Sequence, residues 1–365
     1  MRVGVVINPI SGRHGRHAGE GERRRAFVQS RATALGVDAT VMVTERRGHA
    51  RVLAQQCVDA GYAAVIAMGG DGTVNEVAQA LVGTPVALGI VPCGSGDGLA
   101  QGLKLPANMA AALRVAFTAS PTAIDVGYAG DRIFLNIAGI GFDAAVARVF
   151  AARTRRGAWG YVLKTMQLVW SYQAPDYEVR WQTGATEETR RGRKFLIGFA
   201  NAPEYGNHAV LAPDADVTDG LVDLLLVDAG TVLQQIWRGR RLFWGHRRPA
   251  HGVERARAMR ASVTGSSIVC HLDGELLEMS GTLDIRIRPQ ALLVRMGTGV
   301  FSTETGKTLP SPYSARGSGP KSSPNLIGGR SWNIVSHLPR SDGFDACRYW
   351  RAETGRANAT SAKAA

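Results

Sequence analysis

The first 120 residues alternate between short apolar runs and amphipathic stretches. Four runs, at residues 3–7, 37–43, 63–68 and 86–91, have the length and hydrophobicity of buried strands. After the third run, apolar residues recur at i, i+3, i+4 and i+7 from Val74, which is the spacing of one helix face. This alternation predicts a parallel sheet flanked by helices, with a ligand site beyond the carboxyl ends of its strands.

The pattern changes near Pro121, where we expect a domain boundary. The segments that follow resemble antiparallel strands, interrupted by three stretches with helical spacing. We therefore predict an α/β domain at residues 1–121 and a mainly antiparallel β-sandwich domain at residues 122–301. The expected strands are 123–128, 133–137, 177–182, 194–200, 221–227, 282–288 and 291–296, and the expected helices are 142–152, 160–171 and 232–243. Residues 302–365 are rich in Ser, Gly, Pro and Arg, which predicts a disordered tail.

Three glycines lie at the turn between the third apolar run and the following helix, in the stretch Gly69-Gly70-Asp71-Gly72-Thr73. Backbone without side chains lets N–H groups approach a ligand closely. The helix N-terminus adds unpaired donors and a partial positive charge, and together these features favour a phosphate group. The stretch has neither the Gly-Lys-Ser/Thr of a P-loop nor the Gly-x-Gly-x-x-Gly of a dinucleotide-binding loop.

Asp71 places a carboxylate where a phosphate would bind. Two close anions repel each other unless a cation, a proton or a water lies between them. Asp71 therefore favours Mg²⁺ and phosphoryl transfer. The alternative is a tight glycine turn in which Asp71 caps the helix.

A second glycine-rich turn follows the strand predicted at residues 86–91. It contains Gly94, Ser95, Gly96 and Asp97. Two such turns at the ends of strands are more specific than either alone, so we expect both to line one site. Asp97 adds a second carboxylate, and its alternative role is to cap the helix that follows.

Together these motifs resemble those of the lipid kinase family that contains the diacylglycerol kinases, bacterial lipid kinases and sphingosine kinases. The resemblance covers residues 1–300 and implies that the last strand returns to the first domain. It rests on the first glycine turn with the Asn-Glu pair after it, and on the Asn-Pro-x-Ser-Gly turn after the first strand. The Gly-Ser-Gly of the second turn resembles the sphingosine kinase branch, although the family usually has Asn at the position of Asp97. NAD kinases and phosphofructokinases carry a related loop, so the resemblance implies their type of α/β fold.

The resemblance implies that ATP lies across the two glycine turns. The implied nucleotide-binding residues are Asn8, Pro9, Ser11, Gly12, Thr44, Gly69, Gly70, Asp71, Gly72, Thr73, Asn75, Glu76, Gly94, Ser95, Gly96 and Asp97.

Acidic groups gather on a turn-rich loop between Ala212 and Leu221, and cations bind oxygen ligands of this kind. The family carries Pro-x-Ala-x-x-x-Asp-Gly-Leu here. The resemblance implies a structural Mg²⁺ bound by Asp219, with carbonyls near Asp216 and Leu221. The alternative is a simple Asp-Gly turn.

Asp273-Gly274 is typical of a hairpin turn, and Glu275 begins the strand after it. In the family the Asp-Gly-Glu supplies the proposed general base, which implies that Glu275 is catalytic together with Asp71. Asp71 would hold the metal and its waters or act as the base itself.

Two further residues of the family motifs have structural interpretations. We expect His271 to be a packed or surface histidine. Asp143 lies in the stretch 136–144, which resembles the family's Asn-x-x-Gly-x-Gly-Phe-Asp/Glu-Ala, and we expect it to be structural.

The chain is basic, with a net charge of +13, and the 301 residues before the tail carry 34 basic against 26 acidic side chains. Such a surface attracts nucleic acid, nucleotides or anionic lipid headgroups. No helix-turn-helix, zinc finger or aromatic-basic RNA pattern is present, so we expect no nucleic acid partner. No apolar run reaches the roughly 18 residues of a membrane span, and the start does not resemble a signal peptide. The four cysteines show no metal spacing, which favours a reducing cytoplasm.

We predict a cytoplasmic enzyme, peripherally associated with membranes, that uses ATP and Mg²⁺ to phosphorylate a lipid hydroxyl. Diacylglycerol and sphingoid or ceramide-like lipids all fit, and a homodimer is left open. One alternative is an NAD kinase-like enzyme, which would need a nicotinamide-dinucleotide site. The other is a catalytically inactive nucleotide- or lipid-binding regulator, which the departure at Asp97 favours.

Overall fold

The computed structural model describes residues 1–12, 19–94, 96–151, 167–206, 209–243 and 250–297. Ser95, most of the helix expected at residues 160–171, and the tail expected from residue 302 lie outside the described residues. Among the described residues, no helix combines the length and hydrophobicity needed to cross a bilayer.

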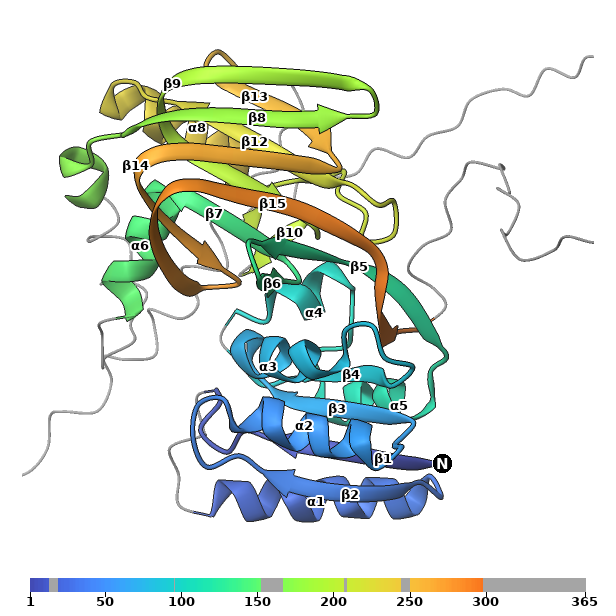
Figure 1. The fold of residues 1–365 in the computed structure, drawn as a ribbon. Helices are drawn as coiled ribbons and strands as arrows, with labels where there is room; N and C mark the ends of the chain where they lie inside the picture. The colour runs from blue at the N-terminus through green and yellow to red at the C-terminus, as the bar shows by residue number, and fades with distance from the viewer. Residues whose placement is uncertain (13–18, 95, 152–166, 207–208, 244–249, 298–365) are drawn as a thin grey trace, which may run out of the picture. The chain divides into compact units, whose positions relative to one another are not determined.

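The first 120 residues form a parallel sheet covered by helices, as predicted (Figure 1). Its strands run in the order β2-β1-β3-β4, and their registers bring the carboxyl ends to one edge. Helices α1 and α5 pack on one face, and α2 and α3 pack on the other. The strands are β1 (Arg2–Ile7), β2 (Asp38–Val43), β3 (Ala64–Gly69) and β4 (Ala87–Pro92). The helices are α1 (Glu20–Ala34), α2 (His49–Asp59), α3 (Asp71–Leu81), α4 (Gly98–Gly102) and α5 (Met109–Thr118).

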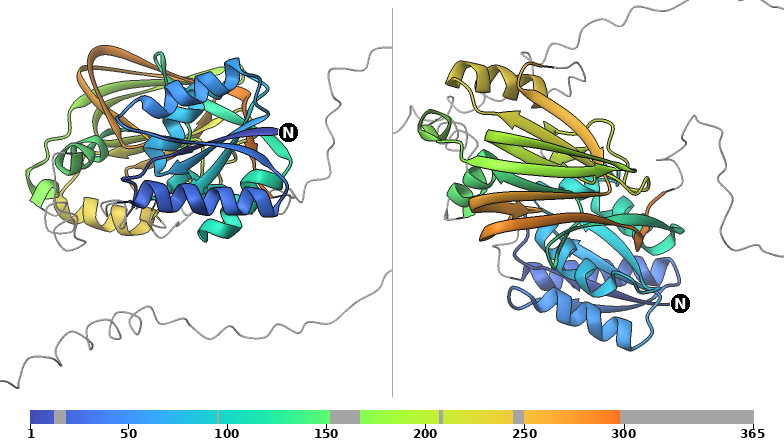
Figure 2. Two further views of the ribbon diagram at one scale, coloured as in Figure 1. Left: turned by 90° about the horizontal axis from the view of Figure 1, so that it is seen from below. Right: turned by 45° about the horizontal axis from the view of Figure 1, so that its top comes forward.

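The following residues form antiparallel strands that fold back on one another (Figure 2). Strand β14 pairs with β7 through residues 270–272 and with β8 through residues 260–264. Strand β9 likewise pairs with both β7 and β8, so these long strands pass between two layers, as in a β-sandwich. The strands are β5 (Pro121–Ala129), β6 (Arg132–Phe134), β7 (Ile137–Gly141), β8 (Asp176–Thr183), β9 (Thr186–Ala200), β10 (Glu204–Gly206), β11 (Ala209–Val210), β12 (Val222–Asp228), β13 (Val253–Ala258), β14 (Arg260–Leu272) and β15 (Glu275–Arg295). Helices α6 (Phe142–Ala151) and α8 (Val232–Phe243) accompany these strands.

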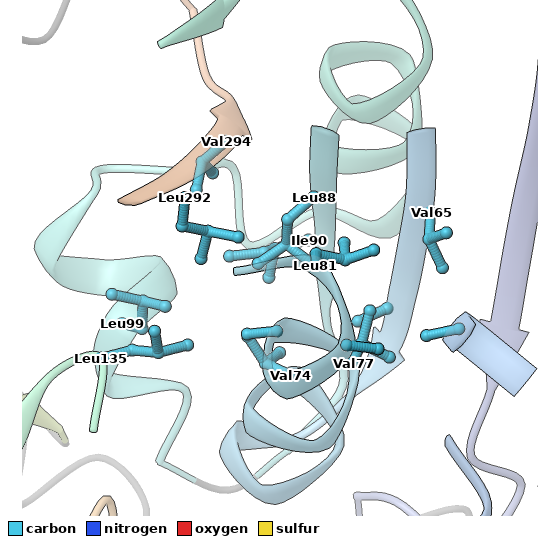
Figure 3. Close-up of a cluster of buried hydrophobic side chains, with 14 of the residues drawn as sticks. Val65, Val74, Val77, Leu81, Leu88, Ile90, Leu99, Leu135, Leu292 and Val294 are labelled. Atoms are coloured by element: carbon cyan, nitrogen blue, oxygen red, sulfur yellow. The ribbon is translucent and has the colours of Figure 1, made fainter. Parts of the chain in front are cut away.

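Strand β15 joins the two parts of the fold. It begins beside β14, and near its end Val294 pairs with Leu88 of β4. Leu292 and Val294 enter the core that lies between α3 and β4 (Figure 3). The boundary expected near residue 121 falls between α5 and β5, and the last strand returns to the first half, as the family resemblance implied.

Two differences from the predicted strands have a local cause. The strands expected at 282–288 and 291–296 form one strand, in which the register shifts between Arg288 and Leu292 and Gln290 takes φ 50°. Such an irregularity bends a strand without ending it. In the sequence it interrupts the apolar pattern, which therefore predicted two strands. Strand β13 was not expected, because its apolar positions alternate with Glu and Arg and no apolar run marks it.

Candidate active site

The two glycine turns touch each other at the carboxyl ends of β3 and β4. The Cys93 N–H donates to the Gly69 carbonyl oxygen at 2.8 Å. A Cβ atom built on Gly94 would lie 2.8 Å from the Gly70 Cα, which is closer than real Cβ atoms come to neighbours. Glycine at these positions therefore allows the backbones to meet, and the geometry leaves no room for side chains between them.

The turn after β1 packs against both glycine turns. The Asn8 side chain donates from Nδ2 to Thr73 Oγ1 at 2.9 Å. Gly12 has φ 82°, and a Cβ on it would lie 2.4 Å from the Cys93 carbonyl oxygen. The Thr44 N–H donates to the carbonyl oxygen of Ile7 at 2.8 Å, which brings the end of β2 to the same edge.

A buried arginine, which the sequence analysis did not single out, holds the turn after β1. Arg24 of α1 is only 5% exposed, and its Nη1 and Nη2 donate to the carbonyl oxygens of Asn8 and Ser11, each at 2.9 Å. Its Nε donates to Glu20 at 2.9 Å. Arg24 lies in a stretch rich in basic residues. The sequence does not distinguish it from the others, because its burial depends on tertiary packing.

Asp71 points from the start of α3 toward the second glycine turn. Its carboxylate accepts the backbone N–H groups of Gly98 and Leu99, at the start of α4, and a Cβ on Gly96 would lie 3.3 Å from Asp71 Oδ2. Burial and, to a smaller extent, the nearby carboxylates of Asp97 and Asp273 outweigh the two N–H donors and raise the pKa of Asp71 to about 6. No side chain caps α3, so Asp71 does not act as a helix cap.

Asp97 closes its own turn. Its Oδ1 accepts the Gly94 N–H at 2.9 Å, its backbone takes φ 47°, and it makes no side-chain cap to α4. Burial also raises the pKa of Asp97. The residue that departs from the family pattern therefore shapes the turn and adds negative charge beside Asp71.

Asn75 and Glu76, both expected at the nucleotide, bond to other parts of the protein. The Glu76 carboxylate accepts the N–H groups of Gly48 at 2.8 Å and Ala50 at 3.2 Å, so it caps the start of α2. Asn75 is buried, and its Nδ2 donates to Asp273 Oδ2 at 2.9 Å.

Asp273 holds the turn between β14 and β15 against the first half of the chain. Besides Asn75, its carboxylate accepts the backbone N–H groups of Leu135 at 2.8 Å, Asn136 at 3.0 Å and Ile137 at 2.9 Å. This is more than a hairpin turn. Because one of the four donors is Asn75 of α3, Asp273 links the turn before Glu275 to the helix that begins with Asp71.

Glu275 forms an ion pair with Arg47, which follows β2. The Arg47 Nη2 donates to Glu275 Oε1 at 2.7 Å, and the arginine side chain is 79% exposed while the glutamate side chain is 34% exposed. Arg47 was not among the predicted site residues, since nothing in the local sequence distinguishes it from its neighbour Arg46.

His271 is fully buried and bonds to Asp143, so both residues have the structural positions that were expected. His271 Nε2 lies 2.8 Å from Asp143 Oδ2, and the Gly274 N–H donates to His271 Nδ1 at 3.3 Å. Burial lowers the pKa of His271, but the adjacent Asp143 outweighs it, and the net direction is upward. A Cβ on Gly139 would lie 2.1 Å from Asp143 Oδ2, so only glycine fits beneath this pair.

The acidic loop before β12 satisfies its charges with protein groups. Asp216 Oδ1 accepts the N–H and hydroxyl of Thr218, and Asp219 Oδ1 accepts the Leu221 N–H at 3.0 Å. Arg257 of β13 lies 3.3 Å from Asp219 Oδ2 and 3.7 Å from Asp223 Oδ1. Its Nη2 donates to the Asp214 carbonyl oxygen at 2.7 Å.

At the predicted structural Mg²⁺ site, Asp219 has a protein cation beside it. The Arg257 guanidinium lies 3.3 Å from Asp219 Oδ2, so a metal ion bound by Asp219 and by carbonyls near Asp216 and Leu221 would compete with this ion pair. The fully buried Asp125, which was not among the predicted residues, also anchors the loop, through the Gly220 N–H at 2.6 Å.

A nucleotide-bound Mg²⁺ fits the Asp71 side of the site better. Mg²⁺ in phosphoryl-transfer sites is held by one or two carboxylates together with phosphates of the substrate. Asp71 and Asp97 supply two carboxylates beside the glycine turns, and their mutual repulsion, with burial, raises the pKa of Asp71. A cation between them would relieve that repulsion.

Comparisons with known proteins identify the family of the chain. Residues 2–129 match the family model "Diacylglycerol kinase catalytic domain", and residues 136–296 match "YegS C-terminal NAD kinase beta sandwich-like domain". A protein of Pseudomonas aeruginosa named "Probable lipid kinase YegS-like" is 31% identical over 78% of this chain and 93% of its own length. One of the same name from Chromohalobacter salexigens is 38% identical over 56% of this chain and 67% of its own length.

A solved structure shows the same fold. The crystal structure of a diacylglycerol kinase from Bacillus anthracis superposes with a TM-score of 0.62 at 17% identity, covering 82% of this chain and 98% of that one. The predicted architecture, an α/β part followed by a β-sandwich part, is confirmed. The matching models and relatives place the chain in the family of diacylglycerol kinase-like and YegS-like lipid kinases.

Proposed function

We propose that this protein transfers the γ-phosphate of ATP to a hydroxyl group of a lipid. The observation that carries the proposal is the Asn75–Asp273 hydrogen bond of 2.9 Å, because it joins the turn that bears Glu275 to the helix that begins with Asp71. A nucleotide site and an acceptor site need such a connection for phosphoryl transfer, since catalysis rests mainly on positioning and charge neutralisation.

The glycine turns would bind the phosphates of ATP. Gly70 and Gly94 expose backbone at the carboxyl ends of neighbouring strands, next to the N-terminus of α3, where phosphate groups bind readily. Asn8 and Thr73 already hydrogen-bond to each other and line the same edge of the sheet.

Asp71 would hold the cation that accompanies ATP. Bound Mg²⁺ supplies charge neutralisation to the transferred phosphoryl group. Asp71 must be deprotonated for this role, and the raised pKa means that the charged form is costly until a cation is present.

Glu275 would take the proton from the lipid hydroxyl. In the absence of substrate its carboxylate is paired with the exposed Arg47. An exposed guanidinium on a long side chain can move from Glu275 to a phosphate oxygen, which would free the carboxylate as ATP binds. Arg47 would then bind Glu275 before ATP arrives and a phosphate of ATP afterwards.

The test is to incubate the purified full-length chain with ATP, MgCl₂ and a total lipid extract, and to identify phosphorylated lipids by mass spectrometry. A new phosphomonoester of one lipid class, absent with Asp71→Asn, would support the proposal and name the lipid. Phosphorylation of added NAD instead would indicate the NAD kinase-like activity. ATP binding without any phosphorylated product would indicate an inactive regulator.

A further inference from the structure

Helix α8 buries two polar side chains and exposes two large apolar ones. Gln235 and Arg238 are buried, at 6% and 4% exposure, whereas Leu233 and Trp237 are 75% and 50% exposed. Positions 233, 237 and 240 are spaced i, i+4 and i+7, so they lie on one face of the helix. Val232 and Ile236 are half-buried, so α8 packs through these two apolar side chains and two buried polar ones, while Leu233 and Trp237 face outward.

The buried polar residues fix that orientation. The Arg238 Nε donates to the His251 carbonyl oxygen at 3.0 Å, and its Nη1 donates to the Asp228 carbonyl oxygen at 2.8 Å. Gln235 Nε2 donates to the same Asp228 oxygen at 2.9 Å. Rotating the helix to bury Leu233 and Trp237 would break these three hydrogen bonds, so the outward apolar face is built into the structure.

Basic residues accompany the exposed apolar ones. Arg240 and Arg241 lie in the last turn of α8, and the Arg241 guanidinium carbon lies 4.9 Å from the centre of the Trp237 ring. Between Asp228 and Glu254 the sequence contains five arginines and no acidic residue. A helix that presents Leu and Trp with adjacent arginines has the composition of helices that lie in the headgroup region of anionic membranes.

A second exposed tryptophan lies on a segment that is linked by side-chain contacts to the turn that carries Glu275, the proposed base. Trp170 is 67% exposed in the helical segment 167–171. Tyr172, which follows this segment, contacts the Phe142 ring edge-to-face, with 5.5 Å between the ring centroids. Asp143, the next residue after Phe142, bonds to His271 beside the turn that carries Glu275. In Figures 1 and 2 the segment 167–171 and α8 lie at the same end of the β-rich part.

We propose that the outward face of α8, formed by Leu233, Trp237, Arg240 and Arg241, docks the protein on an anionic phospholipid membrane. Membrane is favoured over nucleic acid because the face is centred on exposed Leu and Trp, and over a second copy because its charges are all of one sign. The choice of a lipid surface rests on the proposed function, but docking itself needs neither ATP nor turnover. The face would deliver the enzyme to a membrane that contains its lipid substrate.

Vesicle flotation without ATP tests the docking step. The full-length chain should float with vesicles of phosphatidylglycerol and phosphatidylcholine, and much less with phosphatidylcholine alone. The double variant Leu233→Ser/Trp237→Ser should lose at least about tenfold in partitioning, because two apolar side chains no longer enter the bilayer. Arg240→Gln/Arg241→Gln should lose roughly fivefold per charge on the anionic vesicles only.

Matched variants elsewhere serve as controls. Val52→Ser changes an apolar residue that is 45% exposed on α2, and Arg31→Gln removes a charge from the last turn of α1; both should float like the wild type. Far-ultraviolet circular dichroism would verify that each variant is folded. Unchanged flotation of both double variants would overturn the proposal.

Two further measurements separate the other possible occupants and the kinase reaction. If light scattering showed a dimer that Leu233→Ser/Trp237→Ser dissociates, the face would bind a second copy. If the double variant lost only binding to a single-stranded RNA, the face would bind nucleic acid. Either result would overturn the proposal. With a short-chain soluble diacylglycerol, the double variant should keep wild-type turnover, while turnover on vesicles falls with flotation. Absence of any phosphorylated lipid with the wild type, from the total extract as well as from the short-chain diacylglycerol, would refute the proposed function and leave the flotation result standing.

Discussion

Asn75 Nδ2 lies 2.9 Å from Asp273 Oδ2, although the two residues are 198 positions apart in the chain. Asn75 belongs to the helix that follows the first glycine turn, and Asp273 belongs to the turn that precedes Glu275. The same Asp273 carboxylate accepts three backbone N–H groups at residues 135–137. One half-buried carboxylate therefore connects the two ends of the candidate site.

Removing the Asn75 donor should destabilise this connection. We expect Asn75→Ala to lower the free energy of unfolding by about 1–3 kcal/mol, because the half-buried Asp273 carboxylate loses one of its four hydrogen-bond partners. Asn75→Asp should cost more, since it places two carboxylates together. Urea unfolding measures both, with Gln55→Ala on the exposed side of α2 as the control. Equal stability of Asn75→Ala and the wild type would show that the three backbone donors suffice.

Asp71 should matter more to turnover than Glu275. The transition state of phosphoryl transfer is loose, so charge neutralisation contributes more than proton removal. We expect Asp71→Asn to lower kcat by at least about 100-fold and Glu275→Gln by about 10-fold. Steady-state kinetics on the lipid identified by mass spectrometry would measure both, with circular dichroism as a check on folding. Equal or reversed losses would contradict this ranking.

The raised pKa of Asp71 predicts how stability depends on pH. Its pKa is about 6 when folded, against roughly 4 when unfolded, so between these values the folded state binds more protons. The free energy of unfolding should therefore fall as pH rises from about 4 to about 6, by on the order of 2 kcal/mol from this residue. Asp71→Asn should lack that contribution, and the difference between urea unfolding curves of the two proteins isolates it. Identical pH dependence in both proteins would mean that Asp71 ionises as it does in the unfolded chain.

Two glycines of the turns should respond in opposite ways to alanine. A Cβ on Gly94 would lie 2.5 Å from Asp97 Oδ1 and 2.8 Å from Gly70 Cα, so Gly94→Ala should destabilise the protein by about 1–3 kcal/mol. A Cβ on Gly72 meets nothing within 4 Å, and alanine there should stabilise α3 by up to about 1 kcal/mol. If ATP phosphates approach this backbone, Gly72→Ala should nevertheless weaken ATP binding. Thermal unfolding and calorimetric titration with ATP and MgCl₂ separate the two effects, and unchanged ATP affinity would remove Gly72 from the site.

Arg257 should make the acidic loop independent of metal ions. Because its guanidinium lies beside Asp219 and Asp223, the melting temperature of the wild type should be the same in EDTA and in MgCl₂. Arg257→Gln should lower stability by up to about 1 kcal/mol, since the arginine is 43% exposed and its ion pairs are partly screened. A melting temperature that falls in EDTA for the wild type would restore the structural Mg²⁺ at Asp219.

Local sequence was sufficient for the strands of the parallel sheet and for the two glycine turns. The apolar runs and the helical spacing from Val74 report burial over a few neighbouring residues, and glycine reports backbone that must come close to something. Because the two turns follow neighbouring parallel strands, sheet geometry brings them together. Helix α8 begins and ends at Val232 and Phe243, as its spacing predicted.

Tertiary structure alone decided which polar side chains hold the site together. Arg24, Asn75 and Asp273 resemble other polar residues nearby in the sequence, and their roles depend on partners up to 198 positions away. The same holds for Arg257, whose guanidinium lies beside Asp219, the residue that the family resemblance implied as a metal ligand. A sequence pattern records how often a position faces the core, but a hydrogen bond depends on atomic distances that exist only once distant segments have packed.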